Sequence, residues 1–128
     1  MRKAIRLGLA TMSLAMALGT PAFASPAKGG VQKSGPCSAA STWKLKASPD
    51  SGRIEVSFEV DSNVAGQKWS VTLKDNGVKV WSGTATTQAP SGSFEVRKFI
   101  ANKAGADKIQ GTASFAATGE VCKGTVTL

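Results

Sequence analysis

Residues 68–84, KWSVTLKDNGVKVWSGT, decide the fold class of this chain. Apolar Trp69, Val71 and Leu73 alternate with polar residues, and a second alternating run, VKVW, follows a few positions later. Alternation with a period of two is typical of a β-strand that has one face on a core and the other in water. The Asn-Gly pair between the runs supplies the positive φ angles that a two-residue hairpin turn needs. The stretch therefore predicts an antiparallel hairpin.

The same alternation recurs in five other stretches, STWKLKA, RIEVSFEV, FEVRKFIA, KIQGTASFAA and VCKGTVTL. Turn-forming clusters such as SPDSG, TTQAPSGS and TGE separate them. In FEVRKFIA, Phe99 is out of phase with Phe94 and Val96, and we expect a β-bulge near Arg97 or Lys98 to restore the register. Short strands without any helical period predict an all-β fold, a seven-stranded antiparallel immunoglobulin-like β-sandwich.

The first 24 residues have the features of a secretory signal peptide. A basic head, MRKAIR, precedes the uncharged run LGLATMSLAMAL, and small residues follow in GTPAFA. This pattern predicts cleavage between Ala24 and Ser25, a secreted, extracellular product and no stable membrane anchor. Residues 25–36, SPAKGGVQKSGP, are expected to form a flexible leader, because Pro, Gly and Ser dominate them. The sandwich domain is then expected over residues 37–128.

Two cysteines, Cys37 and Cys122, stand at the start and near the end of this predicted domain. In an exported chain, their internal pairing joins the beginning of the folded region to its last strand. The alternatives are two free thiols or half of a metal site. Zinc usually takes four Cys or His ligands, and the sequence contains no histidine. We therefore predict a structural disulfide and neither a bound metal nor a cofactor.

The chain is basic. It has 16 Lys+Arg and 8 Asp+Glu, and three of the bases lie in the predicted signal peptide, which leaves 13 bases, 8 acids and a net charge of +5. The bases are mostly single lysines spread along the chain, whereas nucleic-acid-binding proteins usually concentrate bases and aromatics on one face. We therefore expect weak attraction to anionic surfaces and no nucleic-acid partner.

The stretch DSNVAG is similar to the front half of a calcium-binding loop. Asp61, Asn63 and Gly66 match loop positions one, three and six, but Thr72 stands where a bidentate Glu belongs. The flanking segments are predicted strands, not helices. We expect a strand-to-strand corner in which Asp61 and Asn63 hydrogen-bond backbone amides and Gly66 is left-handed.

No catalytic pattern emerges from the sequence. Glu59 and Asp61 share a strand face at a separation that suits an inverting glycosidase, but carboxylates on an outward face are solvated. There is no histidine to act as a base and no GxSxG elbow. We therefore expect no catalytic residues and no enzyme activity.

One candidate binding surface is aromatic. In VKVW, Lys79 and Trp81 share one face of the predicted strand and two valines share the other. If the valines face inward, Trp81 is exposed beside Lys79 and is available to stack on a sugar or to anchor a protein partner. If the valines face outward, Trp81 covers the end of the core instead.

Several segments together resemble a group of small secreted actinobacterial proteins: CSAASTWKLKASPDSGRIEVSFEVDSN, AGQKWSVTLKDNG, TTQAPSGSFEV, NKAGADKI and GEVCKGTVTL. The resemblance covers residues 37–128 and implies an exported, single-domain, immunoglobulin-like sandwich without supplying a reaction, ligand or functional residue. The resulting prediction is a secreted non-enzymatic binding or interaction module for a cell-wall polymer or an extracellular protein. The alternatives are a small extracellular hydrolase with an unrecognised site, and a secreted inhibitor or effector that acts through the TTQAPSG loop.

Overall fold

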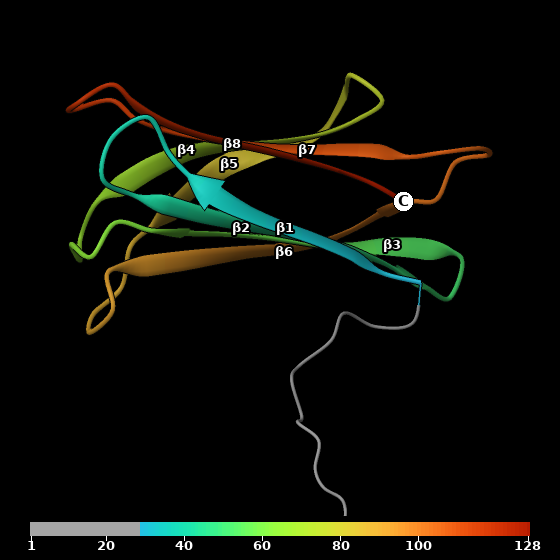
Figure 1. Ribbon diagram of the computed structural model, residues 1–128, viewed down its shortest axis with the longest axis horizontal. Helices are drawn as coiled ribbons and strands as arrows, with labels where there is room; N and C mark the ends of the chain where they lie inside the picture. Colours follow the sequence, from blue (N-terminus) through green and yellow to red (C-terminus); the bar gives the residue numbers. More distant parts are fainter. Residues whose placement is uncertain (1–28) are drawn as a thin grey trace, which may run out of the picture.

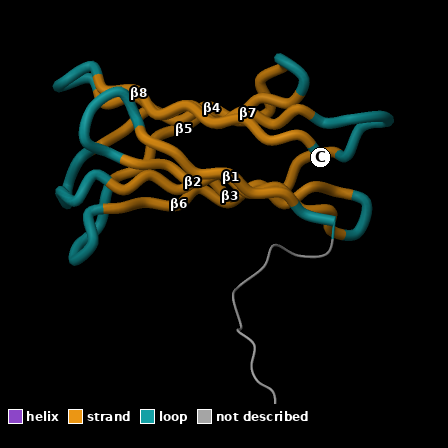
Figure 2. Tube along the Cα trace, viewed as in Figure 1, coloured by secondary structure: helices purple, strands orange, loops and turns teal. Residues whose placement is uncertain are grey.

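The computed structural model describes residues 29–128, which form eight β-strands in two packed layers (Figures 1 and 2). The predicted signal peptide, its cleavage site at Ala24 and Ser25, and residues 25–28 lie outside the described residues. The predicted all-β, immunoglobulin-like sandwich is confirmed, with eight strands instead of seven. Residues 29–128 include no helix with the length and apolar character needed to cross a membrane.

The two layers are four-stranded antiparallel sheets with the orders β1-β2-β3-β6 and β5-β4-β7-β8. The first sheet, the lower layer in Figure 1, contains β1 (Val31–Pro36), β2 (Thr42–Asp50), β3 (Arg53–Asp61) and β6 (Ser93–Ala101). The second sheet, the upper layer, contains β4 (Lys68–Asp75), β5 (Val78–Thr86), β7 (Lys108–Phe115) and β8 (Glu120–Thr127). The chain changes layer after β3, after β5 and after β6, as in Greek-key sandwiches.

The additional strand is β1. The expectation that residues 25–36 form a flexible leader is wrong for residues 31–36, which pair with β2 along their whole length. The segment VQKSGP lacks apolar alternation because this edge strand is exposed at most positions, and only Val31 and Gly35 are partly covered. Backbone pairing to β2 therefore forms this strand with little help from side-chain burial.

The core lies between the inner faces of the sheets, and the predicted alternation places it there. Trp69 is fully buried, as predicted, whereas Trp43 is half-buried at the margin of the core. The Phe58 ring of β3 packs on Gly111 of β7, where a Cβ would lie 2.9 Å from ring atoms. Gly124 in β8 makes room for the Trp43 ring in the same way. These glycines allow large rings from one sheet to pack against the backbone of the other.

The predicted bulge near Arg97 or Lys98 is wrong, because β3 and β6 stay in register over their whole length. Phe99 consequently points outward and is 45% exposed. The Arg53 guanidinium lies 4.3 Å from the centroid of its ring. The irregularity in register lies instead in the β4–β5 pair.

Cys37 and Cys122 form the predicted disulfide. Cys37 lies in the loop after β1, and the fully buried Cys122 lies in β8, so the bond joins the edges of the two sheets. In Figure 1 this loop rises from the lower layer toward β8. Beside the bond, Ser41 donates hydrogen bonds from its N–H and its hydroxyl to the Glu120 carboxylate, at 2.8 and 3.0 Å.

Candidate functional site

The structure separates the two residues of the predicted aromatic surface. Trp81 lies opposite Leu73, and Lys79 lies opposite Lys74, so one residue of β5 is inserted between the two pairs. Because of this bulge, Trp81 turns toward the core and is half-buried, while Lys79 remains on the outer face. The Lys98 ammonium lies 4.8 Å from the centroid of the Trp81 ring. Trp81 is therefore part of the core margin, and Lys79 belongs to a different surface.

The DSNVAG stretch forms a corner, as expected. The Asn63 N–H donates to Asp61 Oδ1 at 2.9 Å, and both Asn63 and Gly66 have positive φ angles. The Gly66 N–H donates to the Thr87 carbonyl at 2.8 Å, which ties the corner to the loop before β6. Within residues 29–128, no group of three or more His, Cys, Asp or Glu side chains is arranged to hold a metal ion.

The TTQAPSG loop lies against this corner. Thr87 is buried; its hydroxyl donates to the Val64 carbonyl at 2.6 Å and accepts the Gln67 N–H at 2.9 Å. Gly92 has a φ of 76° and approaches the backbone of Asn63 and Val64 so closely that any Cβ there would overlap it. The loop and the corner therefore brace each other, which gives both a structural role.

A shallow hollow with a volume of about 390 Å³ on the outer side of β1, β2 and β3 contains the predicted carboxylate pair, Glu59 and Asp61. Lys44 Nζ lies 3.9 Å from Glu59 Oε1. The indole N–H of Trp43, which also borders the hollow, donates to the Pro36 carbonyl at 3.1 Å. The hollow thus contains an ion pair and an aromatic group whose polar edge already has a partner.

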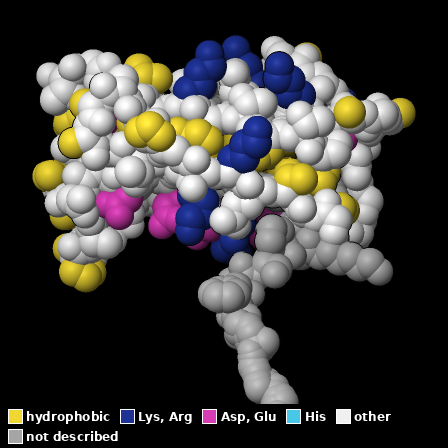
Figure 3. Space-filling model, in the orientation of Figure 1, with side chains coloured by type: hydrophobic (Ala, Val, Ile, Leu, Met, Phe, Trp, Pro, Cys, Tyr) yellow, Lys and Arg dark blue, Asp and Glu magenta, His cyan; other side chains and the backbone are white. Residues whose placement is uncertain are grey.

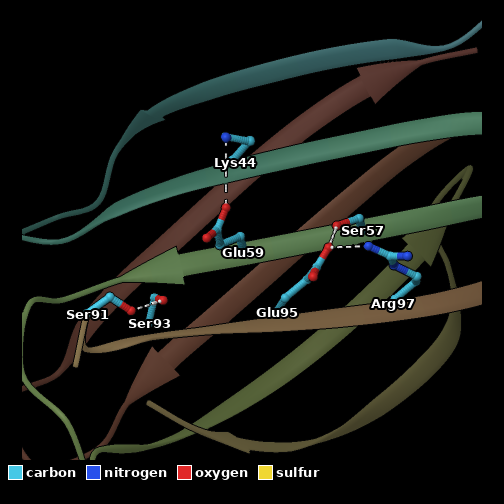
Figure 4. Close-up of polar contacts among 7 residues, drawn as sticks. All are labelled: Lys44, Ser57, Glu59, Ser91, Ser93, Glu95 and Arg97. Carbon is cyan, nitrogen blue, oxygen red and sulfur yellow. Dashed lines mark hydrogen bonds and ion pairs between the residues drawn. The ribbon is translucent and has the colours of Figure 1, made fainter. Parts of the chain in front are cut away.

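The outer face around this hollow contains ion pairs between neighbouring strands (Figure 4). Glu95 accepts hydrogen bonds from the Ser57 hydroxyl and, at 3.1 Å, from the Arg97 guanidinium, and these bonds lower the pKa of Glu95. Arg97 also lies 3.5 Å from Glu55. The acids on this face are Asp50, Glu55, Glu59, Asp61 and Glu95, and they are interleaved with Lys44, Lys46, Arg53 and Arg97.

The outer face of the β5-β4-β7-β8 sheet has a different composition, and we call it the lysine–hydroxyl face. Its lysines are Lys68, Lys74, Lys79, Lys108 and Lys123. Its hydroxyl side chains are Ser70, Thr72, Ser82, Thr84, Thr86, Thr112, Ser114, Thr125 and Thr127. No acidic side chain of residues 29–128 lies on this face, because Asp75 and Asp107 are buried and Glu120 bonds to Ser41.

The strand register arranges these groups in rows. Ser82, Thr72, Thr112 and Lys123 are successive cross-strand neighbours over the four strands. Neighbouring strands lie about 4.8 Å apart, and side chains on one face of a strand repeat about every 6.7 Å. The face is therefore a regular array of hydroxyl groups with lysines placed among them. At its hairpin end, a hollow of about 450 Å³ is bordered by Asn76, Gly77, Lys108 and Gln110.

The positive charge of this face is not neutralised from within the described chain. The three ion pairs found among residues 29–128 all lie on the opposite sheet. In the view of Figure 3, Lys and Arg side chains lie along the top of the upper layer, and most of the visible Asp and Glu side chains lie over the lower layer. A surface of one sign attracts oppositely charged ligands over a Debye length.

No protein-family model matches the chain, no curated protein matches it, and no solved structure matches it. A functional proposal therefore rests on the arrangement of side chains in the structure. The sequence alone did not predict the lysine–hydroxyl face, because its lysines occur singly on four strands. The order of these strands in the sheet brings the lysines together.

Proposed function

We propose that this protein is a secreted, non-enzymatic binding module whose lysine–hydroxyl face binds an anionic cell-wall polymer. The observation that carries the proposal is the segregation of charge between the two sheet faces. One face interleaves acids and bases, and the other presents lysines without any carboxylate. A polymer contacts several lysines at once, so contacts that are individually weak act together.

The side-chain types favour a polymer of polyol units joined by phosphodiesters. Lysine ammonium groups pair with phosphates as point charges. Serine and threonine hydroxyls both donate and accept hydrogen bonds, so they suit polyol hydroxyls as well as phosphate oxygens. The lysine–hydroxyl face includes no aromatic ring on which a base would stack, in contrast to single-stranded nucleic-acid sites.

The other functions predicted from the sequence gain no specific support. The Glu59 carboxylate is paired with Lys44 in an open hollow, whereas a general acid usually lies in an enclosed site that excludes water. The TTQAPSG loop is braced by the corner at residues 61–67 rather than presented as a free inhibitory loop. The binding-module proposal is therefore the one with a defined surface.

The test measures binding of the disulfide-bonded protein to poly(glycerol phosphate) by isothermal titration calorimetry at low and moderate salt. The face variant is Lys74→Gln/Lys79→Gln/Lys108→Gln, and the control Lys44→Gln/Lys46→Gln/Arg53→Gln removes the same charge from the outer face of the opposite sheet. We expect the wild-type affinity to fall with salt, the face variant to lose about ten- to a hundredfold, and the control to change by less than about threefold.

Two results would contradict the proposal. Equal losses in the face and control variants would show attraction to net charge without a site. Tighter binding of single-stranded DNA than of poly(glycerol phosphate) would assign the face to a nucleic acid. Circular dichroism of both variants confirms that they fold before their affinities are compared.

A further inference from the structure

Two buried carboxyl groups lie beneath the hairpin end of the lysine–hydroxyl face. Asp75, the last residue of β4, is 0% exposed, and Asp107, just before β7, is 1% exposed. Neither carboxyl oxygen of Asp75 receives a hydrogen bond from any described residue. An ionised carboxylate in such a setting costs free energy, so a bound proton stabilises the fold.

The Asp107 carboxyl is the neighbouring buried acid: Asp75 is the cross-strand partner of Ile109, two residues after Asp107, and both acids are buried. Two ionised carboxyls are both acceptors, so Asp75 lacks a donor until one of the two carries a proton. Backbone hydrogen bonds fix Asp107 in this place: its N–H donates to a Leu128 main-chain oxygen at 3.0 Å, and the Leu128 N–H donates back at 2.9 Å. The Asn76 side chain accepts the Lys108 N–H and donates to the Ala106 carbonyl, which joins the hairpin to the same loop.

The charges around the pair are few. Burial raises the pKa of Asp75 to about 6, the nearby Asp107 carboxyl contributes in the same direction, and Lys103 acts in the opposite direction. Lys103 belongs to the loop before β7, and its N–H donates to Asp107 Oδ1 at 3.4 Å. The cross-strand neighbours of Asp75 are the uncharged Val78 and Ile109.

A proton fits the site better than a metal ion does. Calcium takes six to eight oxygen ligands. The described residues provide no group of three or more acidic, His or Cys ligands here, and the Lys103 charge opposes a bound cation. One proton between two carboxyls instead gives each of them a partner.

We propose that the Asp75–Asp107 pair is a buried proton-binding site that makes the anion affinity of the lysine–hydroxyl face depend on pH. The affinity part rests on the proposed function, whereas the proton site stands on its own geometry. Lys74 and Lys108 adjoin the pair in the sequence, and Lys79 is the cross-strand neighbour of Lys74. Loss of the shared proton places a negative charge beneath these lysines and so weakens their attraction for an anion.

The first test follows unfolding by urea between pH 4 and pH 7.5 without ligand. The pKa of Asp75 is higher in the folded protein than its ordinary value of 3.8, so its contribution to stability is complete below about pH 4 and is lost as the pH rises through about 6. The pKa of Glu95 is lowered, so its contribution to stability changes with pH in the opposite direction. Comparing wild type with a variant at each pH cancels this contribution. Asp75→Asn presents an N–H to Asp107 at every pH.

We expect the urea midpoint of Asp75→Asn to rise relative to wild type as the pH increases from 4 to 7. The control Thr72→Ala, on the outer face of β4, changes no titratable group and should keep a constant difference. A constant difference for Asp75→Asn overturns the proton site. If that variant does not fold, carboxyl ¹³C NMR of the wild type decides: a midpoint for Asp75 near 6 supports the site, and one below about 4.5 overturns it. Stabilisation by millimolar calcium at pH 7 that depends on Asp75 would also overturn it.

The second test compares poly(glycerol phosphate) binding at pH 5 and pH 7.5. We expect the wild-type affinity to fall about two- to fivefold more than that of Asp75→Asn over this range. The same pH dependence in both proteins overturns the regulatory inference and leaves the proposed function intact. Absence of binding at both pH values overturns the proposed function together with its regulation, and the unfolding data then still decide the proton site.

Discussion

Lys74 in β4 and Lys79 in β5 are direct cross-strand neighbours on the outer face of their sheet. Like charges in this position lower the stability of a sheet. On the opposite sheet, Glu59 and Glu95 are also like-charged cross-strand neighbours, but each has a basic partner, Lys44 for Glu59 and Arg97 for Glu95. The anionic polymer of the proposed function would neutralise both ammonium groups when bound.

The first prediction concerns this lysine pair. Lys79→Glu places a carboxylate opposite Lys74, and we expect the free energy of unfolding to rise by about 0.3–0.5 kcal/mol while polymer affinity falls about tenfold or more. Urea unfolding and calorimetry measure the two effects, and Lys79→Gln serves as the uncharged control. A variant that is less stable and binds as tightly as wild type would remove these lysines from the site.

The second prediction concerns the contact between Phe58 and Gly111. A methyl group at residue 111 would lie 2.9 Å from the ring, so Gly111→Ala should destabilise the fold by about 1–3 kcal/mol. Phe58→Leu in the same chain should lessen the added cost, because the smaller side chain can make room. Thr112→Ala, one residue along on the outer face, should change stability by less than about 0.5 kcal/mol. Purely additive effects in this double-mutant cycle would contradict the packing described here.

The third prediction concerns the disulfide, whose cysteines are 85 residues apart. In the chain-entropy model, removing a cross-link of this span costs about 4.5 kcal/mol. The variant Cys37→Ser/Cys122→Ser should therefore lie close to its unfolding midpoint at 37 °C, as thermal melts followed by circular dichroism would show. A loss below about 1 kcal/mol would mean that packing between β1 and β8 already fixes the two edges.

Local signals in the sequence predicted the central part of the fold. Asn76 and Gly77 have the positive φ angles that the Asn-Gly pair indicated, and Trp69, Val71 and Leu73 are buried as their alternation required. These features were predictable because they depend on backbone preferences and on burial within a single strand. The disulfide followed from having only one internal pairing available.

Features that depend on contacts between distant segments were not predictable in the same way. β1 has no apolar pattern of its own and forms by pairing with β2, so its sequence resembled a linker. The bulge lies beside Val80, where it turns Trp81 inward, whereas the sequence predicted one near Arg97 or Lys98. That prediction assumed that Phe99 must face the core, but Phe99 faces outward and contacts Arg53. One signal was present but unused: Asp75 occupies the inward phase of its strand, which is unusual for a carboxylate.

An NMR titration of the ¹⁵N-labelled, disulfide-bonded protein with poly(glycerol phosphate) would map the polymer-binding surface residue by residue. If the lysine–hydroxyl face binds the polymer, the largest backbone amide shifts fall on β4, β5, β7 and the middle of β8, with Lys74, Lys79 and Lys108 among them. Shifts concentrated on β2, β3 and β6, or around the hollow at Glu59, would contradict it.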